Sequence, residues 1–242
     1  MFEKAKKEYL QKHGFEAVQL KAVLFDMDGV LFDSMPNHAR SWSQSMTQFG
    51  LAMTPEEAYL YEGSTGNNTI NMLANRYWGR NATDDEIDEI YSEKCKSFNA
   101  FEEAPDMLGA KEVLEKVKAA GLKVVLVTGS GQLTLLTRLE RHFPGFFDKS
   151  NMITSFDVKH GKPDPEPYLM GLEKAGVHPW EAMVVENAPL GVKSAVAARI
   201  FTLAVNTGPL PDEVLQKEGA NVLLPSMQMF ANQWEKFEKS LI

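Results

Sequence analysis

Two aspartates one residue apart, Asp26 and Asp28, end an apolar run and are followed directly by Gly29. An ionised carboxylate is costly to bury unless a cation or hydrogen-bond donors meet it, so a buried strand seldom ends in two of them. At the carboxyl end of a strand in an open α/β sheet, this pair would face the crevice where such sheets bind ligands. One carboxylate could attack an electrophile while its neighbour transfers protons and a hard cation holds both.

Three further polar groups stand at or just beyond predicted strands. Thr128 ends an apolar run and precedes small residues, so its hydroxyl and the backbone N–H groups beyond it suit phosphate oxygens. Lys162 stands in a loop that two prolines stiffen, and its ammonium suits a phosphoryl group. Glu186 and Asn187 end another strand with oxygen atoms that suit Mg²⁺.

Each group alone has an ordinary structural explanation. Asp-x-Asp pairs are common in loops, a lysine before a proline is usually solvated, and Thr-Gly-Ser or Glu-Asn before a helix can be a cap. Four such groups at successive strand ends, in this order, are improbable as independent accidents. We therefore interpret them as one site.

The composition excludes several classes of protein. The chain has 242 residues, 44% of them apolar and 24% charged, as in an ordinary globular protein. Its net charge of −8 argues against a general nucleic-acid binder. Cys95 is the single cysteine, which excludes an internal disulfide and fits a reducing compartment. No apolar run approaches the roughly 20 residues that span a bilayer, and residues 1–19 lack a signal's apolar segment. We expect a cytoplasmic monomer that binds neither nucleic acid nor membrane.

Short β-rich runs alternate with helical patterns from about Lys21, after a charged N-terminal stretch that predicts a short helix. Apolar strands separated by helices imply a parallel sheet covered on both faces, that is, an α/β Rossmann-like fold. The strands are expected at Ala22–Asp26, Lys123–Thr128, Asn151–Thr154, Ala182–Glu186, Phe201–Val205 and Asn221–Leu224, and the helices between them at Gly109–Ala120, Gln132–His142, Pro165–Ala175 and Leu190–Ala198.

One stretch breaks this alternation, because residues 36 to 104 contain helical patterns and no convincing strand. We interpret residues 35–104 as a small α-helical cap inserted after the first strand, with residues 1–34 and 105–242 forming the core domain. Placed above the aspartate pair, such a cap could exclude water and select substrates. Its aromatic residues are expected in its own core. Its helices are expected at Ser34–Phe49, Pro55–Tyr61, Thr69–Trp78 and Thr83–Phe101.

With these four polar groups the sequence resembles the haloacid dehalogenase-like (HAD) phosphohydrolase superfamily. Its pattern is most similar to the β-phosphoglucomutase-like group with a helical cap, from about Lys21 to the end of the chain. The resemblance implies that Asp26 is a nucleophile that forms an aspartyl-phosphate. It implies that Asp28 is the general acid/base, with a backbone carbonyl that helps to bind Mg²⁺. Because a departing halide needs no proton but a departing oxygen does, Asp28 favours phosphoryl transfer over dehalogenation.

The resemblance also implies roles for the remaining groups. Thr128 and Lys162 would hold the phosphoryl group, and Glu186 and Asn187 would complete the metal site. The loop residues Gly129 and Ser130 would bind substrate.

One position departs from the family pattern. The group usually has Glu-Asp where this chain has Glu186-Asn187, and a neutral amide binds Mg²⁺ more weakly unless another anion helps. Our hypothesis is that Glu62, from the cap loop, enters the site on closure and supplies the missing charge. An exposed acidic loop residue is the alternative explanation for Glu62.

The substrate class follows from how much room the closed cap leaves. A cap carboxylate inside the site favours a small, highly charged substrate. The segment from Glu62 to Gly66, together with those around Thr128 and Asn187, is similar to inorganic pyrophosphatases of this superfamily. In that reading Lys94, on the last cap helix, binds the leaving phosphate; a surface lysine is the alternative.

Two other functions stay open. A hexose-phosphate mutase or sugar phosphatase is favoured by His38, which stands where mutases use a histidine to couple closure to acid/base action. Against a mutase, Gly66 stands about where mutases carry an arginine for the distal phosphate. Asn187 leaves room for a third reading, a non-catalytic phosphate-binding module on the same fold.

Overall fold

The computed structural model describes residues 1–131 and 135–241, and its strands form one six-stranded parallel sheet in the order β3-β2-β1-β4-β5-β6. The predicted α/β, Rossmann-like class is confirmed, and all six strands lie within or close to the predicted ranges. They are β1 (Ala22–Phe25), β2 (Lys123–Val127), β3 (Met152–Ile153), β4 (Ala182–Glu186), β5 (Phe201–Val205) and β6 (Val222–Leu224).

Side chains alternate between the two faces of β1, and each face meets its own set of helices. Val23 and Phe25 join one apolar cluster, whereas Ala22 and Leu24 join another. The first cluster includes residues of α1 (Phe2–His13), α6 (Ala110–Ala119), α7 (Leu135–His142) and α11 (Met227–Leu241), and the second includes residues of α8 (Glu166–Ala175) and α9 (Pro189–Ala197). Helices therefore cover both faces, as expected of strands that are apolar along their whole length.

One helix end and three short helical elements were not part of the prediction. The N-terminal helix, α1, ends at His13 because Gly14 adopts the left-handed conformation that closes a helix. α10 (Asp212–Lys217) was not predicted; it has six residues and no side-chain cap at its N-terminus. The short 3₁₀ turns are η1 (Lys149–Asn151) and η2 (Pro179–Glu181). The predicted start of a helix at Gln132 lies outside the described residues.

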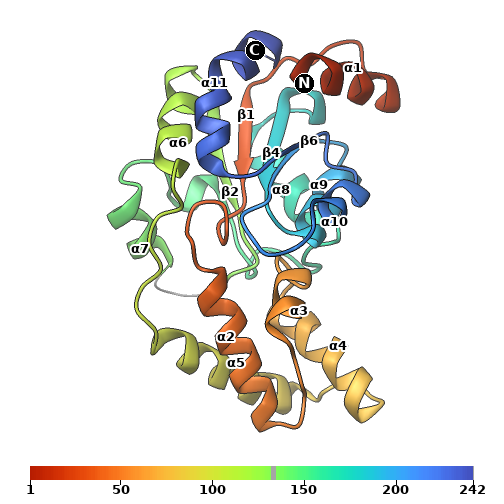
Figure 1. The fold of residues 1–242 in the computed structure, drawn as a ribbon, viewed down its shortest axis with the longest axis vertical. Helices are drawn as coiled ribbons and strands as arrows, with labels where there is room; N and C mark the ends of the chain where they lie inside the picture. Colours follow the sequence, from red (N-terminus) through yellow and green to blue (C-terminus); the bar gives the residue numbers. More distant parts are fainter. Residues whose placement is uncertain (132–134, 242) are drawn as a thin grey trace.

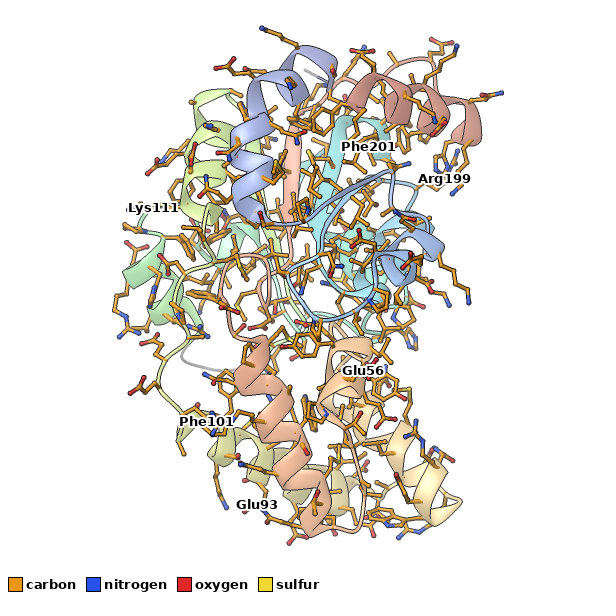
Figure 2. All side chains as sticks on the ribbon, in the orientation of Figure 1. Glu56, Glu93, Phe101, Lys111, Arg199 and Phe201 are labelled. Atoms are coloured by element: carbon orange, nitrogen blue, oxygen red, sulfur yellow. The ribbon has the colours of Figure 1, made fainter. Side chains whose placement is uncertain are left out.

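The four helices predicted for the cap are present. They are α2 (Met35–Gln48), α3 (Pro55–Leu60), α4 (Gly66–Trp78) and α5 (Asp84–Asn99). They share a third apolar cluster of their own, which includes Met46, Ile70 and Ile90. In Figure 1 these helices form the lower part of the molecule, and β1 points toward them. Figure 2 places Phe201 in the sheet region and Glu93 at the opposite, helical end.

The division into a core (1–34 and 105–242) and a cap (35–104) remains our proposal, which the separate apolar cluster supports. The two connections between these parts run side by side. Asp33 N donates to Pro105 O at 2.9 Å, and Met107 N donates to Leu31 O at 2.8 Å. Within the residues that the structure describes, no helix is both long and apolar enough to cross a membrane.

Candidate active site

The carboxyl ends of three neighbouring strands meet at one edge of the sheet, where β1 leads into Asp26, β2 into Thr128, and β4 ends in Glu186. The ammonium of Lys162, from the loop before α8, joins them. Its Nζ donates to Asp26 Oδ1 at 2.5 Å and to Glu186 Oε1 at 2.7 Å. It also donates to the carbonyl oxygen of Val127 at 3.0 Å. All three contacts are buried, so one cation offsets charge from two strand ends.

Protein donors occupy both carboxylate oxygens of Glu186. Oε1 accepts from Lys162 and from the Tyr168 hydroxyl at 2.8 Å. Oε2 accepts from the backbone N–H groups of Asn187 at 2.9 Å and Ala188 at 3.1 Å. In this structure Glu186 orients Lys162. Metal ligation by its carboxylate, which the resemblance implied, would require it to give up one of these bonds.

The Thr128 hydroxyl is arranged to donate a hydrogen bond. Its Oγ1 accepts from the backbone N–H of Ser130 at 3.0 Å, which leaves the hydroxyl hydrogen for another acceptor. Thr128, Gly129 and Ser130 line the same cavity as Asp26 and Asp28. The structure thus brings the predicted phosphate loop and the aspartate pair together.

Asp28 is linked to the cap through a chain of buried side chains. Its Oδ1 accepts from Ser34 Oγ at 2.5 Å and lies 3.2 Å from His38 Nε2. The other ring nitrogen of His38, Nδ1, lies 3.0 Å from Lys94 Nζ. A protonated lysine can only donate, so Nδ1 accepts and Nε2 carries the hydrogen that His38 donates to Asp28.

Lys94 therefore lies inside the site rather than on the surface. Only 3% of it is exposed, and its Nζ lies 5.3 Å from the ring centre of Trp42 and 4.8 Å from that of Phe98. Such contacts favour an ammonium beside aromatic faces. Lys94 and His38 line the cavity together with Asp28, as the pyrophosphatase reading required of a leaving-group site.

The cap loop closes this cavity against the core. Glu62, Gly63 and Ser64 line it opposite Asp26 and Thr128. Its volume is about 60 Å³, which holds only a few water molecules. The closed site therefore leaves little room beside the two aspartates and Lys94.

The ring of Tyr91, on α5, limits the cavity at Gly66. A Cβ at Gly66 would lie 2.4 Å from Tyr91 Cε2, so the ring stands where a larger side chain at position 66 would begin. The sequence did not single out Tyr91, because helical periodicity does not separate a cavity wall from a cap core. Trp42 and Tyr61 were expected in the cap core. Both pack there, and both also line the cavity.

The oxygen atoms that could bind a metal at this site suit a hard cation. Among the described residues, three buried side-chain oxygens at this site have no hydrogen-bond partner: Asp26 Oδ2, Asn187 Oδ1 and Glu62 Oε2. Although Glu62 is only half-buried as a residue, this oxygen is fully enclosed. The described chain holds no group of three His, Cys, Asp or Glu side chains set to bind an ion by themselves, so the amide of Asn187 would complete the set. Oxygen ligands of this kind suit Mg²⁺.

Negative charge exceeds positive charge in this part of the site. Burial, with help from Glu186 and Asp28 and against the effect of Lys162, raises the pKa of Asp26 to about 8. Burial and the neighbouring aspartates also raise the pKa of Glu62 well above its usual range. Burial disfavours the Lys162 ammonium, but its two carboxylate partners outweigh that effect and raise its pKa. A bound cation would relieve this imbalance.

At Asp28 the pKa shifts in the opposite direction. Burial disfavours its carboxylate, but His38 and Ser34 outweigh burial and lower the pKa of Asp28. Arg138 of α7 acts in the same direction. Burial, followed by the charge of Lys94, lowers the pKa of His38, in agreement with the neutral ring deduced above. Ser34 and Arg138 were not predicted, because neither stands at a strand end.

Comparisons with known proteins agree with this geometry. Residues 20–199 match the haloacid dehalogenase-like hydrolases. Hexitol phosphatase A of Escherichia coli K12 is 33% identical over 78% of the chain and 84% of the relative. Pyrophosphatase PpaX of Oceanobacillus iheyensis is 27% identical over 78% and 84%. The solved structure of a "Putative beta-phosphoglucomutase from Bacteroides vulgatus" is 55% identical, with a TM-score of 0.96 over 99% of the chain and 98% of its own.

The raised pKa of Asp26 predicts a pH-dependent stability. Between about pH 4, the usual pKa of an aspartate, and the folded value of about 8, the unfolded chain releases this proton while the folded chain keeps it. Without divalent ions, folding therefore loses stability as the pH rises through this window, by at most about 1.4 kcal/mol per pH unit for one group. Asp26→Asn removes the loss, so its stability relative to wild type should increase from pH 6 to 8.

Urea unfolding at both pH values measures this difference, and added Mg²⁺ should reduce it. Asp33→Asn, at an exposed aspartate nearby, is the matched control. A difference between Asp26→Asn and wild type that does not change with pH would contradict the charge imbalance.

Proposed function

The chain belongs to the haloacid dehalogenase-like hydrolase family, and we propose that it is a Mg²⁺-dependent phosphatase whose substrate is inorganic pyrophosphate. The single observation that carries this choice is the closed site. Its cavity of about 60 Å³ holds the Glu62 carboxylate and is limited by the Tyr91 ring at Gly66. Either substrate would need the cap to move, and a second phosphate, which is smaller than a sugar, would need less movement. Lys94 supplies a buried positive charge where that phosphate would lie.

The core residues perform the first half of the reaction. The Asp26 carboxylate attacks phosphorus, so that an O–P bond to Asp26 forms as the bond to the leaving phosphate breaks. Lys162 and the Thr128 hydroxyl stabilise the charge on the phosphoryl oxygens. Asp26 Oδ2, Asn187 Oδ1 and Glu62 Oε2 would hold Mg²⁺, which when bound reduces the repulsion between the anionic nucleophile and its anionic substrate.

Asp28 moves the protons in both halves. The protonated form of Asp28 donates to a leaving oxygen that needs a proton, and the ionised form takes a proton from the water that attacks phosphorus and releases Asp26. The lowered pKa of Asp28 keeps its carboxylate ionised at neutral pH, so it is free to accept a proton but seldom carries one to donate. That balance suits phosphate, which leaves with little help, better than a sugar alkoxide, which needs a full proton.

Replacing each aspartate by its amide separates the two halves. Asp26→Asn should lose all turnover, since the amide cannot form the O–P bond. Asp28→Asn should still accept the phosphoryl group but release it at least about a hundredfold more slowly. Acid-quenched samples incubated with labelled pyrophosphate would reveal the trapped aspartyl-phosphate. Turnover that survives in Asp26→Asn would rule out the mechanism, whereas absence of phosphoenzyme in Asp28→Asn would rule out the two-step route.

A sugar-phosphate phosphatase or mutase is the second candidate. It is favoured by the names of the E. coli and B. vulgatus proteins and by His38 beside Asp28. Pyrophosphate, β-glucose 1-phosphate and a hexitol phosphate, each assayed with Mg²⁺ for free phosphate and isomerised sugar, distinguish the two. A higher kcat/KM for either sugar substrate would favour the second candidate.

Tyr91 should control this preference through the volume of its ring. We expect Tyr91→Ala to raise kcat/KM for β-glucose 1-phosphate relative to pyrophosphate by about tenfold or more, because the truncation opens the cavity at Gly66. Tyr91→Phe keeps the ring and is the matched control, with the wild-type ratio expected. An unchanged ratio in Tyr91→Ala would show that the ring does not select the substrate.

Glu62 should contribute directly to metal affinity. Glu62→Gln keeps the shape but removes the charge, so the half-saturating Mg²⁺ concentration should rise by about tenfold or more. Calorimetric titration of the substrate-free protein with Mg²⁺ measures this without turnover. Glu57→Gln, on the cap helix before it, is the control. Equal Mg²⁺ affinity in wild type and Glu62→Gln would remove Glu62 from the metal site.

A further inference from the structure

Three core loops each present a glycine to the cap. Gly129 follows β2, Gly161 precedes Lys162, and Gly208 follows β5. None of the three has the positive φ that requires glycine, so their backbone conformations would accept an L side chain. The reason for glycine at these positions must therefore be sought in their surroundings.

In each case the space beside the glycine is filled by the cap. A Cβ at Gly161 would lie 2.5 Å from Thr65 Cγ2, and one at Gly208 would lie 2.9 Å from Tyr59 Cδ1. A Cβ at Gly129 would lie 3.0 Å from the carbonyl oxygen of Gly63. Real Cβ atoms seldom come this close, so a side chain at any of these positions would push the cap away from the core.

The contacts of Gly161 and Gly208 lie on either side of the Glu62 loop. Tyr59 is three residues before Glu62, near the end of α3, and Thr65 is three residues after it, as the N-cap of α4. Figure 1 shows α3 as a cap helix that adjoins the core. The loop is therefore held at both ends against separate core loops.

We propose that Gly161 and Gly208 form a seat for Thr65 and Tyr59, and that this seat sets how deeply Glu62 enters the active site. The four are positioning residues, since none of them needs to touch the substrate. The seat counteracts a specific cost: a closing cap brings the Glu62 carboxylate next to those of Asp26 and Asp28, with Lys162 as the opposing charge. Close packing at two points offsets that repulsion and makes the closed state available to a cation.

The first test uses a clash and its relief. Gly161→Ala should press on the Thr65 methyl and lift the loop, whereas Thr65→Ser removes that methyl and keeps the hydroxyl that caps α4. In the metal-free protein, hydrogen exchange of residues 59–66 should become about tenfold faster in Gly161→Ala. The double variant should return to within about twofold of Thr65→Ser, which is the control.

The second test changes Gly208, which lies in a different loop from the catalytic lysine. Gly208→Ala should displace the Tyr59 ring and accelerate exchange in the same segment, while exchange in β1 and β4 stays unchanged. Calorimetric Mg²⁺ affinity should fall about tenfold in both glycine variants. If either protein is active, KM and the Mg²⁺ requirement should rise more than kcat falls.

The inference rests on the proposed function only for its link to Glu62 and metal. Exchange measures the seat without catalysis, so a protein that does not hydrolyse pyrophosphate would still test it. Unchanged exchange in Gly208→Ala, or a clash in Gly161→Ala that Thr65→Ser does not relieve, would overturn the seat. Faster exchange with unchanged Mg²⁺ affinity would overturn its link to Glu62.

Discussion

The buried ammonium of Lys162 is the interaction on which the rest of the site depends. Its three bonds join Asp26, Glu186 and the last carbonyl of β2, so the ends of three strands share one cation. Without it, Glu186 would keep only neutral donors, and the buried Asp26 carboxylate would lose the cation that pairs with it, which proteins rarely tolerate. Because Tyr168 and two backbone N–H groups hold Glu186, the core itself sets the position of Lys162 and, through it, that of Asp26.

The single positive charge of Lys162 does not balance all the carboxylates of the site, which come from both the core and the cap. Asp28 is satisfied separately by Ser34 and His38, which Lys94 in turn contacts from α5. Asp26 and Glu62 are not, and each keeps a buried oxygen without a partner among the described residues. A site with that balance favours a divalent ion over a neutral ligand. In the proposed metal site, Glu62 of the cap would supply the charge that the neutral Asn187 lacks.

Much of the fold could be predicted because its elements obey local rules. β1 is apolar along its whole length, and β5 is apolar except at the buried Thr202, because helices cover both faces of the sheet; that pattern is visible without coordinates. The cap helices are readable from periodicity and from caps such as Thr83 with Glu86. The missed element, α10, is as short as α3 but lacks a capping side chain such as Thr54 at its start. The polar groups Asp26, Thr128 and Lys162 were found because parallel strands bring their carboxyl ends to one edge.

The fold class, the strand-end carboxylates and the loop residues that meet them can be recognised from spacing along the chain alone. Which oxygens remain available depends on how the folded chain packs. The structure shows that Glu186 is occupied by Lys162 and Tyr168, that Tyr91 fills the space beside Gly66, and that core glycines receive the cap loop. These properties depend on contacts between residues that are far apart in the chain, so no local sequence pattern predicts them.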